Sequence, residues 1–177
     1  MLLSLDISTS CTGYCIFDEN KLVDIGFINL SKHKDFYEKS AKVKSVIKEL
    51  NRKYTIDQVA VEENLQAFRP GLSSAKTLMT LAQFNGTVRW ICSEVFDIKP
   101  DAINVNTARK AVGLKINKKD KSKSTKEKVL EWVNTQEDLK WPTKILKSGP
   151  NKGNIRICPE SYDMADAYVI GKAYFLI

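Results

Sequence analysis

The chain has 177 residues, of which 43% are hydrophobic and 28% are charged. This composition is typical of a globular protein and argues against disorder, and the length suits one domain with a sizeable core. Lysine and arginine outnumber aspartate and glutamate by 28 to 21, which gives a net charge of +7 and a pI near 9.2. A basic surface attracts polyanions, and nucleic acid is a stronger candidate than an anionic membrane.

Much of the positive charge lies in one segment, residues 115–128, with the sequence KINKKDKSKSTKEK. The segment holds seven lysines against Asp120 and Glu127, a net charge of +5 out of the +7 of the whole chain. Such a dense block of lysines is suited to neutralising phosphates.

The four cysteines form no C-x-x-C pair, and the single histidine, His33, is far from them in sequence, so a structural zinc site is not expected. Asp6 interrupts the apolar opening, which argues against a signal peptide, and no apolar run reaches the 18 residues of a membrane span. We therefore expect a cytoplasmic protein with reduced thiols.

The first sixty residues predict a sheet with one crossover helix. Short apolar runs within the first thirty residues predict strands joined by tight turns. Apolar residues then recur at helical intervals from residue 35 to about 54, and a strand reached through such a helix usually runs parallel to its neighbour. The predicted strands are 2–6, 13–17, 22–30, 57–62 and about 102–105, which together make a mixed five-stranded sheet.

Further helices are predicted at about 75–94, 107–112, 124–133 and 162–175. Ser73 or Ser74 is expected to cap the first of these, and Ser161 the last. The helix at 75–94 is apolar over much of its surface, so its second face suits either a partner subunit or the core of a monomer.

The stretch 136–160 lacks clear periodicity and is rich in proline and glycine. We expect an irregular insertion there, with a small hairpin around Ile145 and Ile155. The whole chain, 1–177, is interpreted as a single α/β domain.

Four acidic residues stand where a predicted strand ends or a helix begins. Asp6 ends the run LLSLD and Glu62 ends QVAVE, and a carboxylate in such a place is costly to bury without a partner or a cation. Asp163 and Asp166 are three residues apart, so they share one face of the last helix, although the helix dipole alone also favours acids there. If all four converge, their oxygen ligands suit Mg²⁺ or Mn²⁺. Glu63 competes with Glu62, and strand alternation favours Glu62.

These motifs resemble the RuvC-type Holliday junction resolvases, including phage-type members. The opening LDISTSCTGY is similar to the D-x-(G/S)-x-x-x-T-G-(Y/W) start of that family, VAVEENLQAF is similar to its strand ending in glutamate, and DMADAYVIG resembles its final D-x-x-D-A helix. The stretches FNGTVRWI and ARKAVGLK, with KSTKEKV, also resemble the family and occur in the same order. The resemblance covers nearly the whole chain.

The resemblance implies a ribonuclease-H-like fold, with the mixed five-stranded sheet flanked by helices, and a homodimer built partly on the helix at 75–94. It implies a structure-selective endonuclease that resolves four-way DNA junctions by paired symmetric nicks and leaves 5′-phosphates and 3′-hydroxyls. It also implies that two Mg²⁺ or Mn²⁺ ions are held in each active site by Asp6, Glu62, Asp163 and Asp166.

Side chains near the predicted site are candidates for DNA contacts, and contacts to phosphates give affinity rather than sequence preference. Phe68 suits stacking on an unpaired base at the crossover, and a place in the core suits it equally well. The DNA-binding candidates are Phe68, Arg69, Lys110, Lys118, Lys119, Lys121, Lys123 and Lys126.

Three other functions are compatible with parts of the sequence. A ribonuclease-H-fold nuclease acting on other branched DNA or on RNA–DNA hybrids would use the same four acids. The motif DISTSCTGY is also similar to the first phosphate motif of the sugar-kinase and actin superfamily, but the chain lacks a second domain with its D-x-G loop. A non-catalytic junction binder is disfavoured because all four acids are present.

Overall fold

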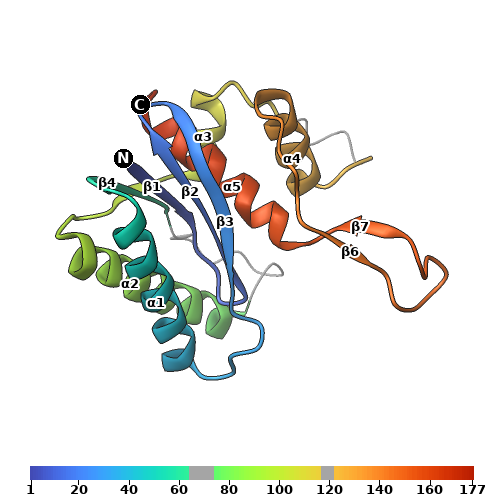
Figure 1. The fold of residues 1–177 in the computed structure, drawn as a ribbon, viewed down its shortest axis with the longest axis horizontal. Coiled ribbons are helices and arrows are strands. Elements are labelled where there is room, and N and C mark those ends of the chain that lie inside the picture. Colours follow the sequence, from blue (N-terminus) through green and yellow to red (C-terminus); the bar gives the residue numbers. More distant parts are fainter. Residues whose placement is uncertain (64–73, 117–121) are drawn as a thin grey trace.

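The computed structural model describes residues 1–63, 74–116 and 122–177. Its centre is a five-stranded sheet with the strand order β3-β2-β1-β4-β5 (Figure 1). The strands β1 (Leu2–Asp6), β2 (Cys11–Asp18) and β3 (Lys21–Asn29) pair antiparallel, whereas β4 (Gln58–Glu62) is parallel to β1 and β5 (Asp101–Ile103) is parallel to β4. The mixed five-stranded sheet and its parallel β1–β4 pair are confirmed.

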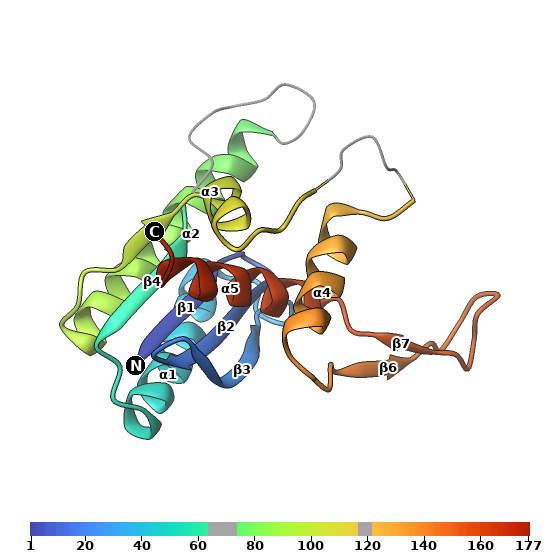
Figure 2. The same ribbon diagram turned by 90° about the horizontal axis from the view of Figure 1, so that it is seen from above.

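Helices cover both faces of this sheet (Figures 1 and 2). One face carries α1 (Phe36–Lys53) and α2 (Ala75–Phe96), and the other carries α3 (Val105–Ala111), α4 (Thr125–Gln136) and α5 (Glu160–Tyr174). Every residue of β1 is buried because successive side chains point to opposite faces and each face meets a helical layer. Leu3 and Leu5 thus join the core under α1 and α2, while Leu2 joins the core under α5.

The central helix α5 lies very close to the sheet because two glycines leave room for it. A Cβ atom on Gly13 of β2 would come within 2.1 Å of the Asp163 carbonyl oxygen, and one on Gly171 of α5 would come within 2.2 Å of the Phe17 ring. Between these points Ser4 Oγ donates a hydrogen bond of 2.8 Å to the Ala167 carbonyl oxygen. The position of α5 over β1 and β2 is therefore tightly defined.

Two details of the predicted elements are wrong. Ser161 does not cap α5: the cap position is Pro159, and the Ser161 hydroxyl is buried without a hydrogen-bond partner among the described residues. Val105 begins α3 instead of ending a strand, because the Asn104 side chain accepts hydrogen bonds from the Asn106 and Thr107 amides and so starts a helix.

A two-stranded hairpin, β6 (Thr143–Ile145) and β7 (Ile155–Ile157), occupies the stretch between α4 and α5. It forms a sheet of its own and projects away from the body of the molecule (Figure 1). No helix in the described ranges is both long and apolar enough to cross a membrane.

Candidate active site

The first two carboxylates meet because their strands are neighbours. In the parallel β1–β4 pair Leu5 lies beside Val61, so the next residues along, Asp6 and Glu62, reach the same end of the sheet. Asp6 is only 8% exposed, and the neighbouring Glu62 carboxylate adds to the effect of burial in raising its pKa. Two carboxyl groups in this arrangement share a proton, or need a cation when both are ionised.

The other two carboxylates come from the first turns of α5. Asp166 is 7% exposed, and Asp163 lies one helical turn before it, at the point where α5 meets Gly13. Gly13 pairs directly with Asp6 across the β1–β2 ladder. The close approach at this glycine therefore carries the acids of α5 to the end of β1.

The charges of the four acids act on one another at this end of the sheet. Burial raises the pKa of Asp6 well above its ordinary range, and the charges of Glu62, Asp166 and Asp163 raise it further. Burial likewise raises the pKa of Asp166, and the charge of Glu62 adds to this effect, although the Arg109 guanidinium opposes it. Carboxyl groups from β1, β4 and α5 thus form one strongly negative site.

Two basic side chains compensate part of this charge. Arg109 Nη2 of α3 lies 3.2 Å from Asp166 Oδ1, and Lys126 Nζ of α4 lies 3.0 Å from Asp163 Oδ1. Partial burial lowers the pKa of Lys126, but its hydrogen bond to Asp163 and the charges of Asp163, Asp6 and Asp166 raise it by more. Lys126 was predicted as a phosphate contact, and the structure places its ammonium group among the carboxylates.

The donor set fits a hard divalent cation, because it consists of carboxylates in a buried site with unbalanced negative charge. With the side chains as they stand, no group of three or more His, Cys, Asp or Glu residues in the described ranges is arranged to hold an ion. Arg109 and Lys126 each contact one oxygen of Asp166 and Asp163, so an ion bound by all four acids would share these carboxylates with the two basic side chains or displace them.

The Glu63 side chain points away from the site formed by the four acids. Its Oε2 atom accepts a hydrogen bond of 3.2 Å from Asn104 Nδ2, at the junction of β5 and α3. The backbone carbonyl of Glu62, in contrast, accepts a hydrogen bond from Asn85 Nδ2 of α2, which is buried. The side chain that raises the pKa of Asp6 is that of Glu62.

Only three of the predicted DNA-binding side chains lie among the described residues, and Lys126 is one of them. Lys110 is exposed on α3, and Lys123 pairs with Glu131 on the surface of α4. Five of the predicted contacts lie outside the described residues: Phe68, Arg69, Lys118, Lys119 and Lys121.

Sequence reasoning missed the roles of Arg109 and Asn85. Arg109 lies next to the fully buried Ala108 on a short helix, and an arginine beside the core usually indicates a buried acidic partner. Asn85 interrupts the apolar face of α2 between Phe84 and Val88, and a polar residue there indicates a specific hydrogen bond.

No protein-family model matches the chain. A curated relative, the crossover junction endodeoxyribonuclease RuvC of Aliarcobacter butzleri (strain RM4018), is 33% identical over 91 residues, which are 49% of this chain and 55% of that protein. The match therefore spans just over half the length of that relative.

Solved structures match over almost the whole chain. A T. thermophilus RuvC structure in complex with a Holliday junction substrate superposes with a TM-score of 0.66 at 16% identity, covering 98% of this chain and 92% of that one. A further Thermus thermophilus RuvC structure gives 0.59, with 16% identity and coverage of 98% and 93%. The yeast mitochondrial Holliday junction resolvase Ydc2 gives 0.57, with 16% identity and coverage of 98% and 77%. The predicted ribonuclease-H-like fold and the resemblance to RuvC are confirmed.

Proposed function

We propose that this chain, which resembles RuvC in sequence and has its fold, is a divalent-metal-dependent endodeoxyribonuclease that resolves four-way DNA junctions by paired symmetric nicks. The observation that carries the proposal is the placement of four carboxylates at one end of the sheet: the β1–β4 register brings Asp6 beside Glu62, and the close approach of α5 at Gly13 brings its two aspartates to the end of β1. A site this negative beside a phosphodiester needs cations.

Asp6, Glu62, Asp163 and Asp166 would hold two Mg²⁺ or Mn²⁺ ions. Bound there, such ions lower the pKa of a water molecule and stabilise the charge that develops on the departing oxygen. In the hydrolysis the water oxygen bonds to phosphorus, the bond from phosphorus to the 3′ oxygen breaks, and that oxygen takes up a proton.

The chain's own side chains prepare the pocket for this reaction. Arg109 and Lys126 balance part of the negative charge before DNA arrives, which keeps the four carboxylates near one another. If bound cations took over that role, the Lys126 ammonium group would be free to contact a phosphate oxygen beside the site. Lys126 is over half exposed, so its release costs little.

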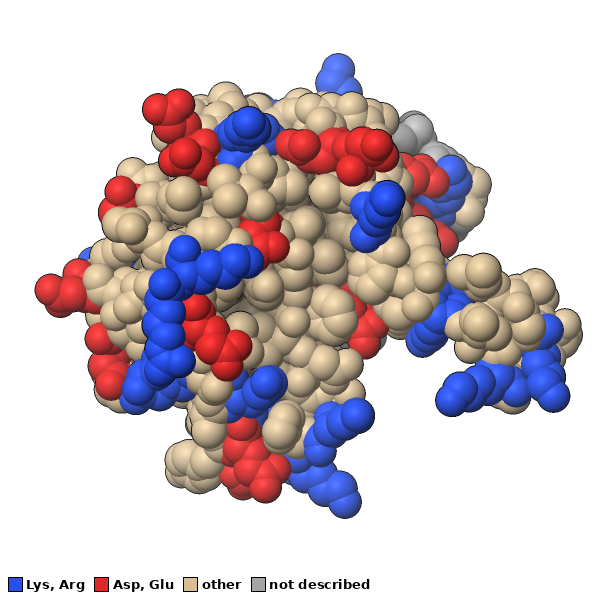
Figure 3. Space-filling model, in the orientation of Figure 1, with Lys and Arg blue, Asp and Glu red and all other residues tan. Residues whose placement is uncertain are grey.

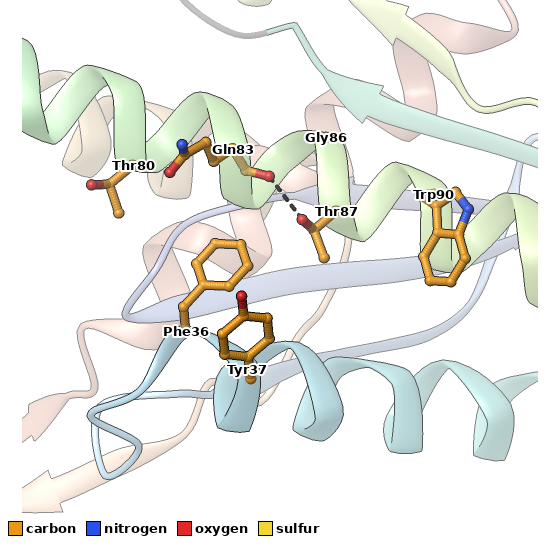
Figure 4. Close-up of a pocket in the computed structure, with 7 residues that line it drawn as sticks. All are labelled: Phe36, Tyr37, Thr80, Gln83, Gly86, Thr87 and Trp90. Atoms are coloured by element: carbon orange, nitrogen blue, oxygen red, sulfur yellow. Dashed lines mark hydrogen bonds between the residues drawn. The ribbon is translucent and has the colours of Figure 1, made fainter.

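The substrate symmetry calls for two active sites, since a four-way junction is nearly two-fold symmetric. We assign the second site to another copy of the chain, packed against the groove between α1 and α2 (Figure 4). This groove has a volume of about 690 Å³ and is lined by Phe36, Tyr37, Thr80, Gln83, Gly86, Thr87 and Trp90.

Gly86 supports this assignment. Glycine inside a helix is about 1 kcal/mol less favourable than alanine. A Cβ atom on Gly86 would meet nothing within 4 Å, so the packing of the described residues does not require glycine there. Close approach of a second helix at this point gives the glycine a purpose, and the exposed Trp90 lies one turn further along α2 on the same side.

The decisive experiment incubates the protein with a labelled four-way junction and Mg²⁺ or Mn²⁺, and maps nicks on all four strands. We expect ligatable nicks at symmetric positions on two opposing strands, none in EDTA and none with Asp6→Asn. A Y-fork and an RNA–DNA hybrid run in parallel separate the related nuclease activities. Preferential cutting of either would replace junction resolution as the function, and junction binding without any nicking would show a non-catalytic binder.

A further inference from the structure

The β6–β7 hairpin is exposed along nearly its whole length. All three residues of β6 are exposed, as are Ile155 and Arg156 of β7. The hairpin makes a sheet separate from the central one and extends beyond the body of the molecule (Figures 1 and 2). A two-stranded hairpin alone in water is only marginally stable, so an arm of this kind is usually retained for what it binds.

The register of the hairpin gives it two different faces. Ile145 pairs directly with Ile155, and these residues are 64% and 73% exposed. Lys144 pairs with Arg156 on the opposite face, because side chains alternate along a strand. Ile157 shares the isoleucine face and packs against the core under α5, so this apolar face starts on the body and continues outward.

The charge of the hairpin has one sign. Residues 139–159 contain five basic residues and no acidic residue. The directly opposed Lys144 and Arg156 repel each other, which destabilises a hairpin unless an anion lies nearby. Glu127 of α4 gives only weak compensation: its pKa is lowered chiefly by hydrogen bonds from Ser124, and Arg156 makes a smaller contribution. Figure 3 shows the arm with Lys and Arg side chains and no acidic ones on the visible face.

We propose that the β6–β7 hairpin is a second DNA-binding element, which grips a duplex arm of the substrate outside the active site. The Ile145–Ile155 face lies against the sugars and base edges of a minor groove, where apolar side chains commonly contact DNA. The long side chains of Lys144 and Arg156, one on each strand, reach past the edges of the hairpin to the phosphates that border this groove. A protein partner would leave the uniform positive charge without a purpose, so DNA is the better match. The inference rests on the proposed function, because it assumes a DNA substrate.

The place of the hairpin in the chain supports this arrangement. Ile157 ends β7 six residues before Asp163, so the arm leaves the body beside the carboxylate end of α5 (Figure 1). From Pro142 to the turn near Gly149 the strand can reach about 20 Å. That reach corresponds to about six base pairs of duplex. The hairpin would therefore lengthen the contact along one arm without touching the scissile phosphate.

The test measures binding of a fluorescent four-way junction and of a linear duplex by anisotropy in EDTA, over a series of salt concentrations. The double variant Lys144→Gln/Arg156→Gln should bind the junction about tenfold more weakly at moderate salt. The slope of log affinity against log salt should become shallower by about 2, because two phosphate contacts are lost. Ile145→Ser/Ile155→Ser should weaken binding several-fold with the slope unchanged.

Lys48→Gln/Arg52→Gln on α1 is the matched control, since it removes the same charge from exposed positions on the opposite helical layer. This control should bind like the wild type, and circular dichroism should show every variant folded. If the hairpin variants bind and nick junctions as the control does, the hairpin proposal is wrong while the proposed function stands. If the isoleucine variant changes the molar mass of the protein and not its DNA affinity, the apolar face binds protein, which also overturns the proposal. If the wild type binds no DNA, the proposed function itself fails.

Discussion

Asp6 is the residue on which function and stability are in conflict. Its raised pKa means that the folded state holds a proton that the unfolded chain releases near its ordinary pKa. The fold therefore loses stability as the pH rises from the ordinary pKa of Asp6 to its raised pKa in the absence of cations, and regains that stability as the pH falls back through the same window. Asn has the same shape and no charge to bury.

We predict that Asp6→Asn raises the melting temperature in EDTA by a few degrees, since ~1 kcal/mol corresponds to ~2–4 °C for a domain of this size. Added Mg²⁺ or Mn²⁺ should raise the melting temperature of the wild type and not that of the variant. Nicking should be lost and junction binding kept.

Asp18→Asn serves as the control for Asp6→Asn, because Asp18 ends β2 in an exposed position. It should change neither the melting temperature nor its response to divalent ions. A metal response in Asp6→Asn equal to that of the wild type would show that the ions bind elsewhere.

Arg109 provides the second test at single residues. It neutralises Asp166, and both side chains of the pair are mostly buried, with exposures of 18% and 10%. Removing one partner leaves the other charge buried and unpaired, so Arg109→Leu should lower the free energy of unfolding by about 2–3 kcal/mol in EDTA, measured by urea titration.

Divalent ions should recover part of this loss, because a cation among the carboxylates replaces the missing guanidinium. The exposed neighbour Lys110→Leu should change the unfolding free energy by less than about 0.5 kcal/mol. An equal loss of unfolding free energy in both variants would mean that any such substitution on α3 destabilises the protein, and that the ion pair is not the cause.

At the level of secondary-structure elements, the contact between β2 and α5 sets the geometry of the site. Gly13→Ala would place a methyl group against the backbone of Asp163, and backbone cannot rotate away as a side chain can. We expect a loss of about 1–3 kcal/mol in unfolding free energy. Nicking should fall more than binding, because the first turn of α5 moves relative to Asp6.

Gly86→Ala is the matched control for Gly13→Ala, since the same added methyl group meets nothing within 4 Å in the described structure. At a concentration where the chain is monomeric, its unfolding free energy should stay equal or rise, as expected for alanine inside a helix, whereas the added methyl group should weaken the proposed contact with a second copy. If Gly13→Ala nicks junctions at the wild-type rate, the close approach of α5 does not control the site.

The main elements were predictable because their signals are local. The apolar run of β1 ending at Asp6, and the helical periodicity of α1 behind the Asp35 cap, can be read directly from neighbouring residues. The start of α5 was not predictable from the sequence, because Pro159 supplies the helical backbone conformation itself and no side-chain cap is needed.

The details of the site depend on contacts distant in sequence. Arg109 meets Asp166 across 57 residues and Lys126 meets Asp163 across 37. No local pattern specifies which lysine of a dense cluster turns towards the acids. The sequence predicted that carboxylates would gather, while the cations that balance them follow from the packing of α3 and α4 against α5.

At the scale of the whole molecule, positive charge is concentrated in two segments. Residues 115–128 and 139–159 each carry a net +5, so the rest of the chain carries −3 and the total is +7. In sequence, the first segment runs into α4 and the second follows it, and α4 packs against α5. Under the proposed function, this distribution would direct the attraction for DNA to the side of α4 and α5 and leave the α1–α2 layer for the proposed second copy of the chain.

The dimer can be tested through Trp90, which is 61% exposed in the groove between α1 and α2. A symmetric interface brings the same patch of both copies together, so one substitution introduces two charges into it. Trp90→Glu should reduce the molar mass in light scattering from about twice 20.0 kDa to 20.0 kDa at micromolar concentration. The monomer keeps its carboxylates but lacks a second site in register, so it should nick single strands and lose paired nicking.

The control for Trp90→Glu is Val23→Glu, which adds the same charge at an exposed apolar position on β3, away from the groove. It should leave both the mass and the pairing of nicks unchanged. Paired nicks made by a wild-type protein of 20.0 kDa at every concentration would contradict the two-copy arrangement. Two monomers would then have to bind independently to opposite strands. In that case the pairing of nicks would depend on protein concentration, and this dependence distinguishes independent monomers from a preformed dimer.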